Sequence, residues 1–409
     1  MSRIVEIERT IFQDLMKKKW FGEDFEFISY EVDPLRKLEQ LKNSDMIFVS
    51  FNLKNDNNVV KKHIFVKFEP KDEDIKRVVF MGNQFYNEIY CYESILPFLM
   101  KEEDVFTNFP KFYSGSNNPN SRFVVLEDIS EFGYKMTNDF MSMDLDHVKL
   151  TLTQLGKFHA MSYAAKLKHP KEFFTKVTNT LMECNWVNGK DGVCHIQVLV
   201  KSTFERTVES LRNKYPDEIK QFFDLINKKE FFLDLVKPEE PISVVCHGDF
   251  VSNNMMYRYS EDGNPEGVKF IDLGMVRYSS PIIDISLYLW FNLSIENRSL
   301  HWEELLQVYH NSLSTTFDNI RVPSFVEIKR EFCRKCVYGL IHTLYSIPIR
   351  STITGENDYD FLKFIKAESP DKLQDLMNTV GGKKGTDLLT ELMADFFENW
   401  YLESICTHF

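Results

Sequence analysis

Polar side chains interrupt an apolar stretch at residues 244–257, VVCHGDFVSNNMMY. Asp249 and Asn254 have the spacing D-x-x-x-x-N, and Asp272 ends the next apolar run, VKFI. Burying carboxylates and amides is costly unless they have partners. Phosphoryl transfer needs these groups in this order. One carboxylate accepts the proton of an attacking hydroxyl, while a second carboxylate and an amide oxygen hold the Mg²⁺ that bridges the phosphates of a nucleotide.

The kinase signature H-R-D-x-x-x-x-N followed by D-F-G has the same order and internal spacing. The matching strings here are His247-Gly248-Asp249 with Asn254, and then Asp272-Leu273-Gly274. The alternative is a polar hairpin whose Asp and Asn side chains satisfy turn amides. The His-Gly pair, the apolar flanks and the strand-terminal Asp272 favour the catalytic interpretation.

A kinase site also needs a lysine on the nucleotide phosphates, oriented by a helix glutamate. Lys67 closes the predicted strand HIFVK, which is where that lysine should stand. On the following helix an apolar stripe is formed at helical spacing by Phe85, Ile89, Tyr92 and Leu96. Glu88 falls within the stripe and Glu93 at its edge, so Glu88 should point to the core and need a cation. Lys67 is the obvious candidate, although a solvated strand-end lysine is the alternative.

Three other polar residues are interpreted as structural support. His159 lies on the apolar side of its helix and is expected to be a satisfied core histidine. His247 should brace the loop that carries Asp249 rather than transfer protons. Asp284, in SSPIIDISLYLW, should start or anchor a helix through its carboxylate.

The elements that must position these groups change character along the chain. Strand-like runs at 46–53 and 62–70 flank a turn-rich KNDNN and predict a hairpin. A helix-like segment, 84–100, and a strand-like segment, 121–130, follow. From about residue 138 the pattern is helical, with one short β unit inset. The fold class is therefore α+β, a small antiparallel β-sheet lobe with one helix and a large, mostly helical lobe.

The boundaries expected from this pattern are 1–127 for the N-terminal lobe and 128–409 for the C-terminal lobe. The second lobe would carry a catalytic loop at 244–257 and a metal-binding loop at 268–277.

Composition limits the partners. The net charge of −12 argues against binding a nucleic-acid backbone and weakly against docking on anionic membranes. The N-terminal sequence has no apolar signal-peptide core, and no run approaches the length of a bilayer span. The seven scattered cysteines predict reduced thiols, and Cys333 and Cys336 have CxxC spacing without a second pair to complete a zinc site. We therefore expect a cytoplasmic protein with no membrane insertion and no evident obligate protein partner.

The motifs together resemble a known family. FYNEIYCYESILP, VVLEDISEFGYKM, GKFHAMSYA, CHGDFVSNNMMY, KFIDLGMVRYSSPIIDISLYL and YGLIHTLYSIPI are similar, in order, to the blocks of the insect ecdysteroid kinase-like family. This group has a CHK kinase-like domain and is related to choline kinases and aminoglycoside phosphotransferases. The resemblance covers roughly residues 40 to 350.

The resemblance implies a protein-kinase-like fold and ATP-dependent phosphorylation of a small-molecule hydroxyl, with ATP and Mg²⁺ as cofactors. The acceptor would be an ecdysteroid, or a xenobiotic alcohol or phenol in a detoxification role. By motif, Asp249 would be the general base, and Asn254 and Asp272 would bind Mg²⁺. Lys67 would contact the phosphates and Glu88 would orient it. The VLEDIS segment resembles the hinge that holds adenine, with the candidate residues Leu126, Glu127 and Asp128.

The chain departs from the pattern in two places. No glycine occurs between Gly22 and Gly82, so the phosphate-covering loop, expected around Leu41 to Asp45, is not glycine-rich. Many relatives read Asp-Phe-Gln where this chain has Asp272-Leu273-Gly274. The metal-binding Asp remains, so the departure concerns local packing.

Three alternatives stay open. A choline or ethanolamine kinase would hold its cation with aromatics and carboxylates. A catalytically silent kinase fold could bind a ligand or partner, although the complete set of candidate residues argues against it. A metal-dependent phosphohydrolase would need further His or Asp ligands at recognisable spacing.

The acceptor pocket is expected from helices at 171–235 and the C-terminal helices. Its aromatic residues would suit an apolar alcohol or a helical core equally well; they are Phe173, Phe174, Trp186, Phe222, Phe223, Phe231 and Phe232.

Overall fold

The computed structural model describes residues 7–22, 25–33, 45–55, 58–78, 80–101, 107–137, 142–188, 194–353 and 370–400. The N-terminal part is a five-stranded antiparallel sheet with the order β1-β2-β3-β5-β4. Its strands are β1 (Glu26–Asp33), β2 (Asp45–Lys54), β3 (Val59–Phe68), β4 (Phe112–Asn118) and β5 (Ser121–Glu127). The predicted hairpin is present as β2 and β3, and β5 is the predicted strand that begins at Ser121.

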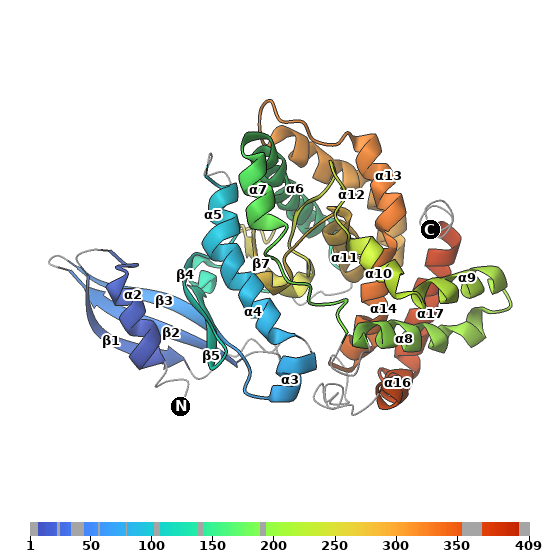
Figure 1. The fold of residues 1–409 in the computed structure, drawn as a ribbon, viewed down its shortest axis with the longest axis horizontal. Coiled ribbons are helices and arrows are strands. Elements are labelled where there is room, and N and C mark those ends of the chain that lie inside the picture. The colour runs from blue at the N-terminus through green and yellow to red at the C-terminus, as the bar shows by residue number, and fades with distance from the viewer. Residues whose placement is uncertain are drawn as a thin grey trace.

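Helical segments cover both faces of this sheet (Figure 1). On one face, η1 (Ile7–Ile11) and α2 (Phe12–Lys17) bury apolar side chains against Val49, Phe51, Ile64 and Val66. On the other face lie α4 (Met81–Tyr90), η2 (Cys91–Ile95) and α5 (Leu96–Leu99), which join the main core. The sequence predicted one helix in this lobe. The structure adds the N-terminal pair and α3 (Glu73–Val78), because strands with apolar residues on both faces need a second cover.

The C-terminal part is mostly helical, and the two parts form the two-lobed, kinase-like architecture expected from the sequence (Figure 1). Its helices are α6 (Leu145–Lys168), α7 (Pro170–Val177), α8 (His195–Leu211), α9 (Pro216–Ile226), α10 (Lys229–Val236), α11 (Ile282–Asn292), α12 (Ile295–Thr315), α13 (Phe325–Lys335), α14 (Val337–Ile353), α16 (Pro370–Thr379) and α17 (Gly382–Asn399). No helix within the described ranges is long and apolar enough to cross a membrane.

Two small antiparallel sheets interrupt the helices. The sequence predicted a single β unit in this region. β6 (Val244–Cys246) pairs with β9 (Arg277–Ser279), and β7 (Met255–Tyr259) pairs with β8 (Pro265–Phe270). The loop between β6 and β7 and the loop between β8 and β9 therefore start and end on the same four strands. This pairing holds the two predicted functional loops side by side.

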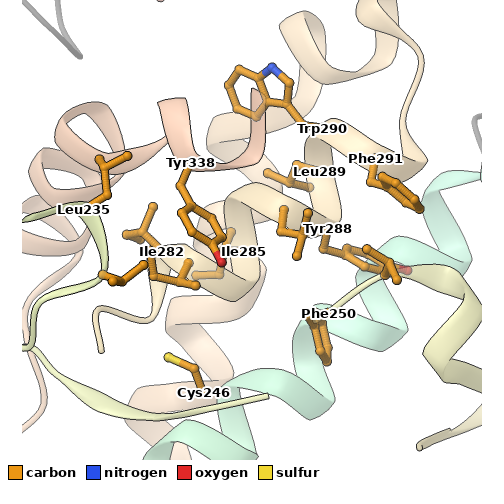
Figure 2. Close-up of a cluster of buried hydrophobic side chains, with 14 of the residues drawn as sticks. Leu235, Cys246, Phe250, Ile282, Ile285, Tyr288, Leu289, Trp290, Phe291 and Tyr338 are labelled. Atoms are coloured by element: carbon orange, nitrogen blue, oxygen red, sulfur yellow. The ribbon is translucent and has the colours of Figure 1, made fainter. Parts of the chain in front are cut away.

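Helix α11 is the centre of the C-terminal core, because every one of its residues is buried. Figure 2 shows its Ile282 and Ile285 between Cys246 of β6 and Tyr338 of α14, and its Leu289 farther along the helix near Trp290. Helix α14 can approach α11 closely because Gly339 has no side chain. A Cβ there would lie 2.3 Å from the carbonyl oxygen of Ser286. The core thus gives the loop after β6 a rigid floor.

Candidate active site

Lys67 connects the two lobes through its ion pairs. Its Nζ lies 2.9 Å from Oε2 of Glu88 on α4 and 2.8 Å from Oδ1 of Asp272 after β8. The ion pair expected between Lys67 and Glu88 is therefore present, and Asp272 joins it. Glu93, the other glutamate considered on this segment, is exposed.

The charges of this group stabilise one another. Burial alone would lower the pKa of Lys67, but the carboxylates of Asp272 and Glu88 reverse that effect and raise it. Burial would likewise raise the pKa of Asp272, but Lys67 holds it below its ordinary value. The Glu88 side chain is only 1% exposed, and burial raises its pKa against the attraction of Lys67. A charged Lys67 is thus required to keep both carboxylates in place.

Asn87, the residue before Glu88, fastens α4 to the C-terminal lobe. Its Oδ1 accepts from the backbone N–H of Met182 at 2.9 Å, and its Nδ2 donates to the Met182 carbonyl at 2.8 Å. The same Nδ2 also donates to the carbonyl of Gly274 at 3.2 Å. The side chain is fully buried. The helix that carries Glu88 is therefore held against the loop that carries Asp272.

Asp249 and Asn254 face each other across the loop between β6 and β7. Nδ2 of Asn254 donates to Oδ2 of Asp249 at 2.8 Å and to its backbone carbonyl at 2.8 Å. The carbonyl of Asn254 accepts from the N–H of Ile271 at 3.0 Å, which ties this loop to Asp272. Asn254 is buried and Asp249 is half-buried. The amide nitrogen of Asn254 is committed to Asp249, so its amide oxygen points away from that carboxylate.

Asp284 holds the start of the same loop. Its Oδ2 accepts from the N–H of His247 at 2.7 Å and its Oδ1 from the N–H of Gly248 at 2.8 Å. We expected the Asp284 carboxylate to start or anchor a helix, but it binds a loop instead. The residue lies in the first turn of α11, but its carboxylate binds the backbone ahead of Asp249. It is a loop anchor, and the buried His159 contacts it at 3.3 Å from the other side.

His247 braces the loop, as predicted. Its Nε2 lies 3.0 Å from the carbonyl oxygen of Ile271, directly before Asp272. Gly248 is required for the same close packing. Its φ is +86°, and a Cβ there would lie 1.8 Å from the carbonyl oxygen of Met275. Any side chain at position 248 would push the two loops apart.

The predicted metal ligands, Asn254 and Asp272, offer an amide oxygen and a carboxylate, which are the ligand types that Mg²⁺ takes in proteins. A second group with metal-binding residue types, His159, Cys246 and Asp284, is fully buried. Both carboxylate oxygens of Asp284 already accept backbone N–H groups, and burial raises the pKa of the Cys246 thiol well above its ordinary range. This second group is a structural anchor rather than a metal centre.

The predicted hinge residues lie at the end of β5: Leu126 and Glu127 are its last two residues, and Asp128 follows it. The N–H of Glu127 donates to the carbonyl of Lys111 at 2.8 Å, and the N–H of Asp128 donates to the carbonyl of His63 at 3.2 Å. The Asp128 carboxylate accepts from the N–H and the hydroxyl of Ser130. Leu126 is buried. The backbone N–H groups of Glu127 and Asp128 are therefore engaged with neighbouring backbone carbonyls of the same lobe. The loop predicted to cover the phosphates, around Leu41 to Asp45, lies outside the described residues except for Asp45.

Sequence reasoning passed over two residues of this region. Asn87 could have been predicted to have a partner, because it is a second polar residue beside Glu88 on a largely apolar helix. His342 of α14 stood in the block YGLIHTLYSIPI but was not considered as a site residue. The structure buries it beside Trp186, at a ring-centroid distance of 5.6 Å.

Comparison with known proteins identifies a family. The family model described as the ecdysteroid kinase-like family matches residues 43–322. A search of curated proteins found no match. Among solved structures, the chain is similar to a spectinomycin phosphotransferase in complex with ADP and spectinomycin. The identity is 13% and the TM-score 0.36, over 93% of this chain and 98% of that one.

It is also similar to an ADP-bound aminoglycoside phosphotransferase, with 14% identity and a TM-score of 0.32 over 91% of this chain and 99% of that one. Scores this low carry no argument about substrates.

Proposed function

Because the chain belongs to the ecdysteroid kinase-like family, we propose that it transfers the γ-phosphate of ATP to a hydroxyl of a small, apolar acceptor. The observation that supports this most is the ion pair of Lys67 with both Glu88 and Asp272, at 2.9 and 2.8 Å. A lysine, a helix glutamate and a metal-binding aspartate must all be in place for phosphoryl transfer. The three residues meet here although Lys67 and Asp272 are 205 positions apart.

Each residue has a role in this proposal. Asp249 accepts the proton of the acceptor hydroxyl, and its half-buried position leaves it reachable by a ligand. Asn254 keeps that carboxylate oriented through its amide nitrogen. Asn254 and Asp272 would hold Mg²⁺, which neutralises charge that develops on the phosphates. Lys67 binds phosphate oxygens while Glu88 keeps it in position.

The acceptor proposed is an ecdysteroid, or a xenobiotic alcohol or phenol, and the setting is the cytoplasm. The described cysteines are free, consistent with a reducing compartment. Most of the aromatic residues expected around the acceptor pack instead into the helical core. Phe222, for example, lies against Phe204 and against Phe396 of α17. The acceptor must therefore be bound by fewer side chains than the sequence suggested.

The test is transfer of labelled phosphate from ATP to a panel of steroid, phenolic and amino-alcohol acceptors, with mass-spectrometric detection of the product. Asp249→Asn is the control, because it keeps the shape of the side chain and removes the base. We expect phosphorylation of a hydroxyl that depends on Mg²⁺ and on Asp249. Equal transfer by both proteins, or binding of ATP with no transfer to any acceptor, would contradict the proposal. The second result would favour a silent, ligand-binding kinase fold.

A further inference from the structure

Two neighbouring aromatic residues bury polar atoms that have no hydrogen-bond partner. Nε1 of Trp186 and Nε2 of His342 are both buried and unpaired. The residues are only 2% and 6% exposed, and their rings are 5.6 Å apart at the centroids. Buried polar atoms in folded proteins are nearly always satisfied, so this pair is a place where a ligand or an ordered water can bind.

These residues belong to an aromatic group that reaches Asp249. Nδ1 of His342 lies 2.8 Å from the hydroxyl of Tyr345, which is half-buried on the same helix. Burial raises the pKa of Tyr345, and the negative charge of Asp249 raises it further, as it does for Tyr338. Tyr338 packs its ring 4.4 Å from that of His342. The influence of the Asp249 charge on both tyrosines indicates that the group lies near the proposed base.

The group is kept electrically neutral. Burial and then the positive charge of Arg277 lower the pKa of His342 to about 3. Arg277 is itself paired with Glu183 at 3.2 Å, and Glu183 also accepts from the backbone N–H of Trp186 at 3.2 Å. His342 therefore offers a neutral imidazole, and Trp186 offers an N–H that can only donate.

We propose that Trp186 and His342 bind the polar groups of the acceptor and select a neutral acceptor over a cationic one. This inference rests on the proposed phosphotransfer, since it assigns the acceptor to the space beside Asp249. The tryptophan N–H would donate to a hydroxyl or carbonyl oxygen of the acceptor. The histidine Nε2 would accept from, or donate to, a second polar group, according to how Tyr345 fixes its tautomer.

The chemistry of the group favours an alicyclic or phenolic alcohol with at least two oxygen functions. Its aromatic faces match an apolar ring system, and its two unpaired atoms match separate oxygens. The quaternary ammonium group of a choline-like alcohol could make no hydrogen bond to either atom, and it would be repelled by the positive charge of Arg277, which acts on His342. Because Glu183 already balances Arg277, that pair offers no spare negative charge to a cation.

The experiment measures acceptor binding separately from chemistry. The ADP-loaded full-length protein is titrated by calorimetry with a polyhydroxylated steroid, a substituted phenol and choline. The variants are Trp186→Phe, which removes only the N–H, and His342→Phe. The matched control is Trp400→Phe, because Trp400 Nε1 is also buried and unpaired but packs against Trp290 and Trp302 instead. ADP affinity and melting temperature report whether each variant is folded.

We expect a neutral ligand to bind the wild type, and Trp186→Phe and His342→Phe each to weaken it about tenfold, as for the loss of a buried hydrogen bond. ADP affinity and the Trp400→Phe control should be unchanged. His342→Gln, which restores a neutral hydrogen-bonding group, should recover part of the loss. Unchanged steroid and phenol affinity in both variants would mean that water satisfies these atoms, and would overturn the inference. So would binding of choline alone, although phosphoryl transfer to choline would leave the proposed reaction standing.

Discussion

The substitution Lys67→Met tests the centre of the proposed site through stability as well as activity. It removes a cation that contacts both Glu88 and Asp272 and leaves a methionine of similar length. Glu88 has one further oxygen, Oε1, that is buried without a partner, so it cannot compensate. Removing one partner of a buried ion pair costs about 3 to 5 kcal/mol because the remaining charge is left buried.

The double variant Lys67→Met/Glu88→Gln separates this effect from simple loss of packing. With Glu88 neutral, less uncompensated charge remains near the core, and part of the lost stability should return. A coupling of about 1 to 3 kcal/mol is expected in a double-mutant cycle for residues in direct contact. Phosphoryl transfer should stay absent in the double variant, because no ammonium is left for the phosphates.

The assay is urea unfolding followed by circular dichroism, combined with a transfer assay on each variant. Lys61→Met is the matched control, because Lys61 lies on the same strand and pairs with Glu31 at 2.9 Å on the surface. Exposed ion pairs contribute about 0 to 1 kcal/mol, so this control should be nearly as stable as the wild type. Additive losses in the double variant, or equal losses at Lys61 and Lys67, would refute the coupling.

The other predictions concern the two loops, the helix and the aromatic group. Asp249→Asn should lower phosphoryl transfer by about 10² to 10⁴-fold while ATP affinity, measured by calorimetry, stays the same. Asn254→Ala and Asp272→Ala should abolish the difference in ATP affinity with and without Mg²⁺, and a difference that persists would exclude them as metal ligands. Asn87→Ala should lower kcat at unchanged KM for the acceptor, because it loosens the helix that orients the lysine; a change in KM alone would place its role elsewhere. His342 has a pKa near 3 in the folded protein and about 6.5 when unfolded, so the unfolded chain binds more protons and stability falls as pH drops below about 6.5. His342→Phe should reduce the loss of unfolding free energy between pH 6.5 and 5 by about 1.5 kcal/mol, and an unchanged pH profile would contradict the burial of a neutral ring.

The ion pair of Lys67 and Glu88 could be predicted from the sequence, because a charged residue within an apolar pattern is a local signal. Glu88 within a helical apolar stripe already required a cation, and the structure supplies it at Lys67. The hairpin of β2 and β3 was equally local, since alternating apolar residues surround a turn. Such features need only neighbours along the chain to be visible.

Other parts of the arrangement depended on distant partners. The position of Asp284 predicts a residue that starts a helix. Its carboxylate instead binds the N–H groups of His247 and Gly248, far earlier in the chain. The aromatics of residues 171–235 were equally consistent with a pocket and a core. Phe222, for example, contacts Phe396 of α17, more than a hundred residues later in the chain, and this contact places it in the core. No local pattern could have shown either contact.

The attachment of α4 by Asn87 also bears on how such a protein can be controlled. In protein kinases the position of the corresponding helix is a means of control. Here, moving α4 outward would break the bonds of Asn87 to Met182 and Gly274 together with the Lys67–Glu88 pair. At a combined cost of about 4 kcal/mol, only about one molecule in a thousand would populate the outward arrangement. The inward position of α4, and with it the pairing of Lys67 and Glu88, is therefore built into the fold before any ligand binds.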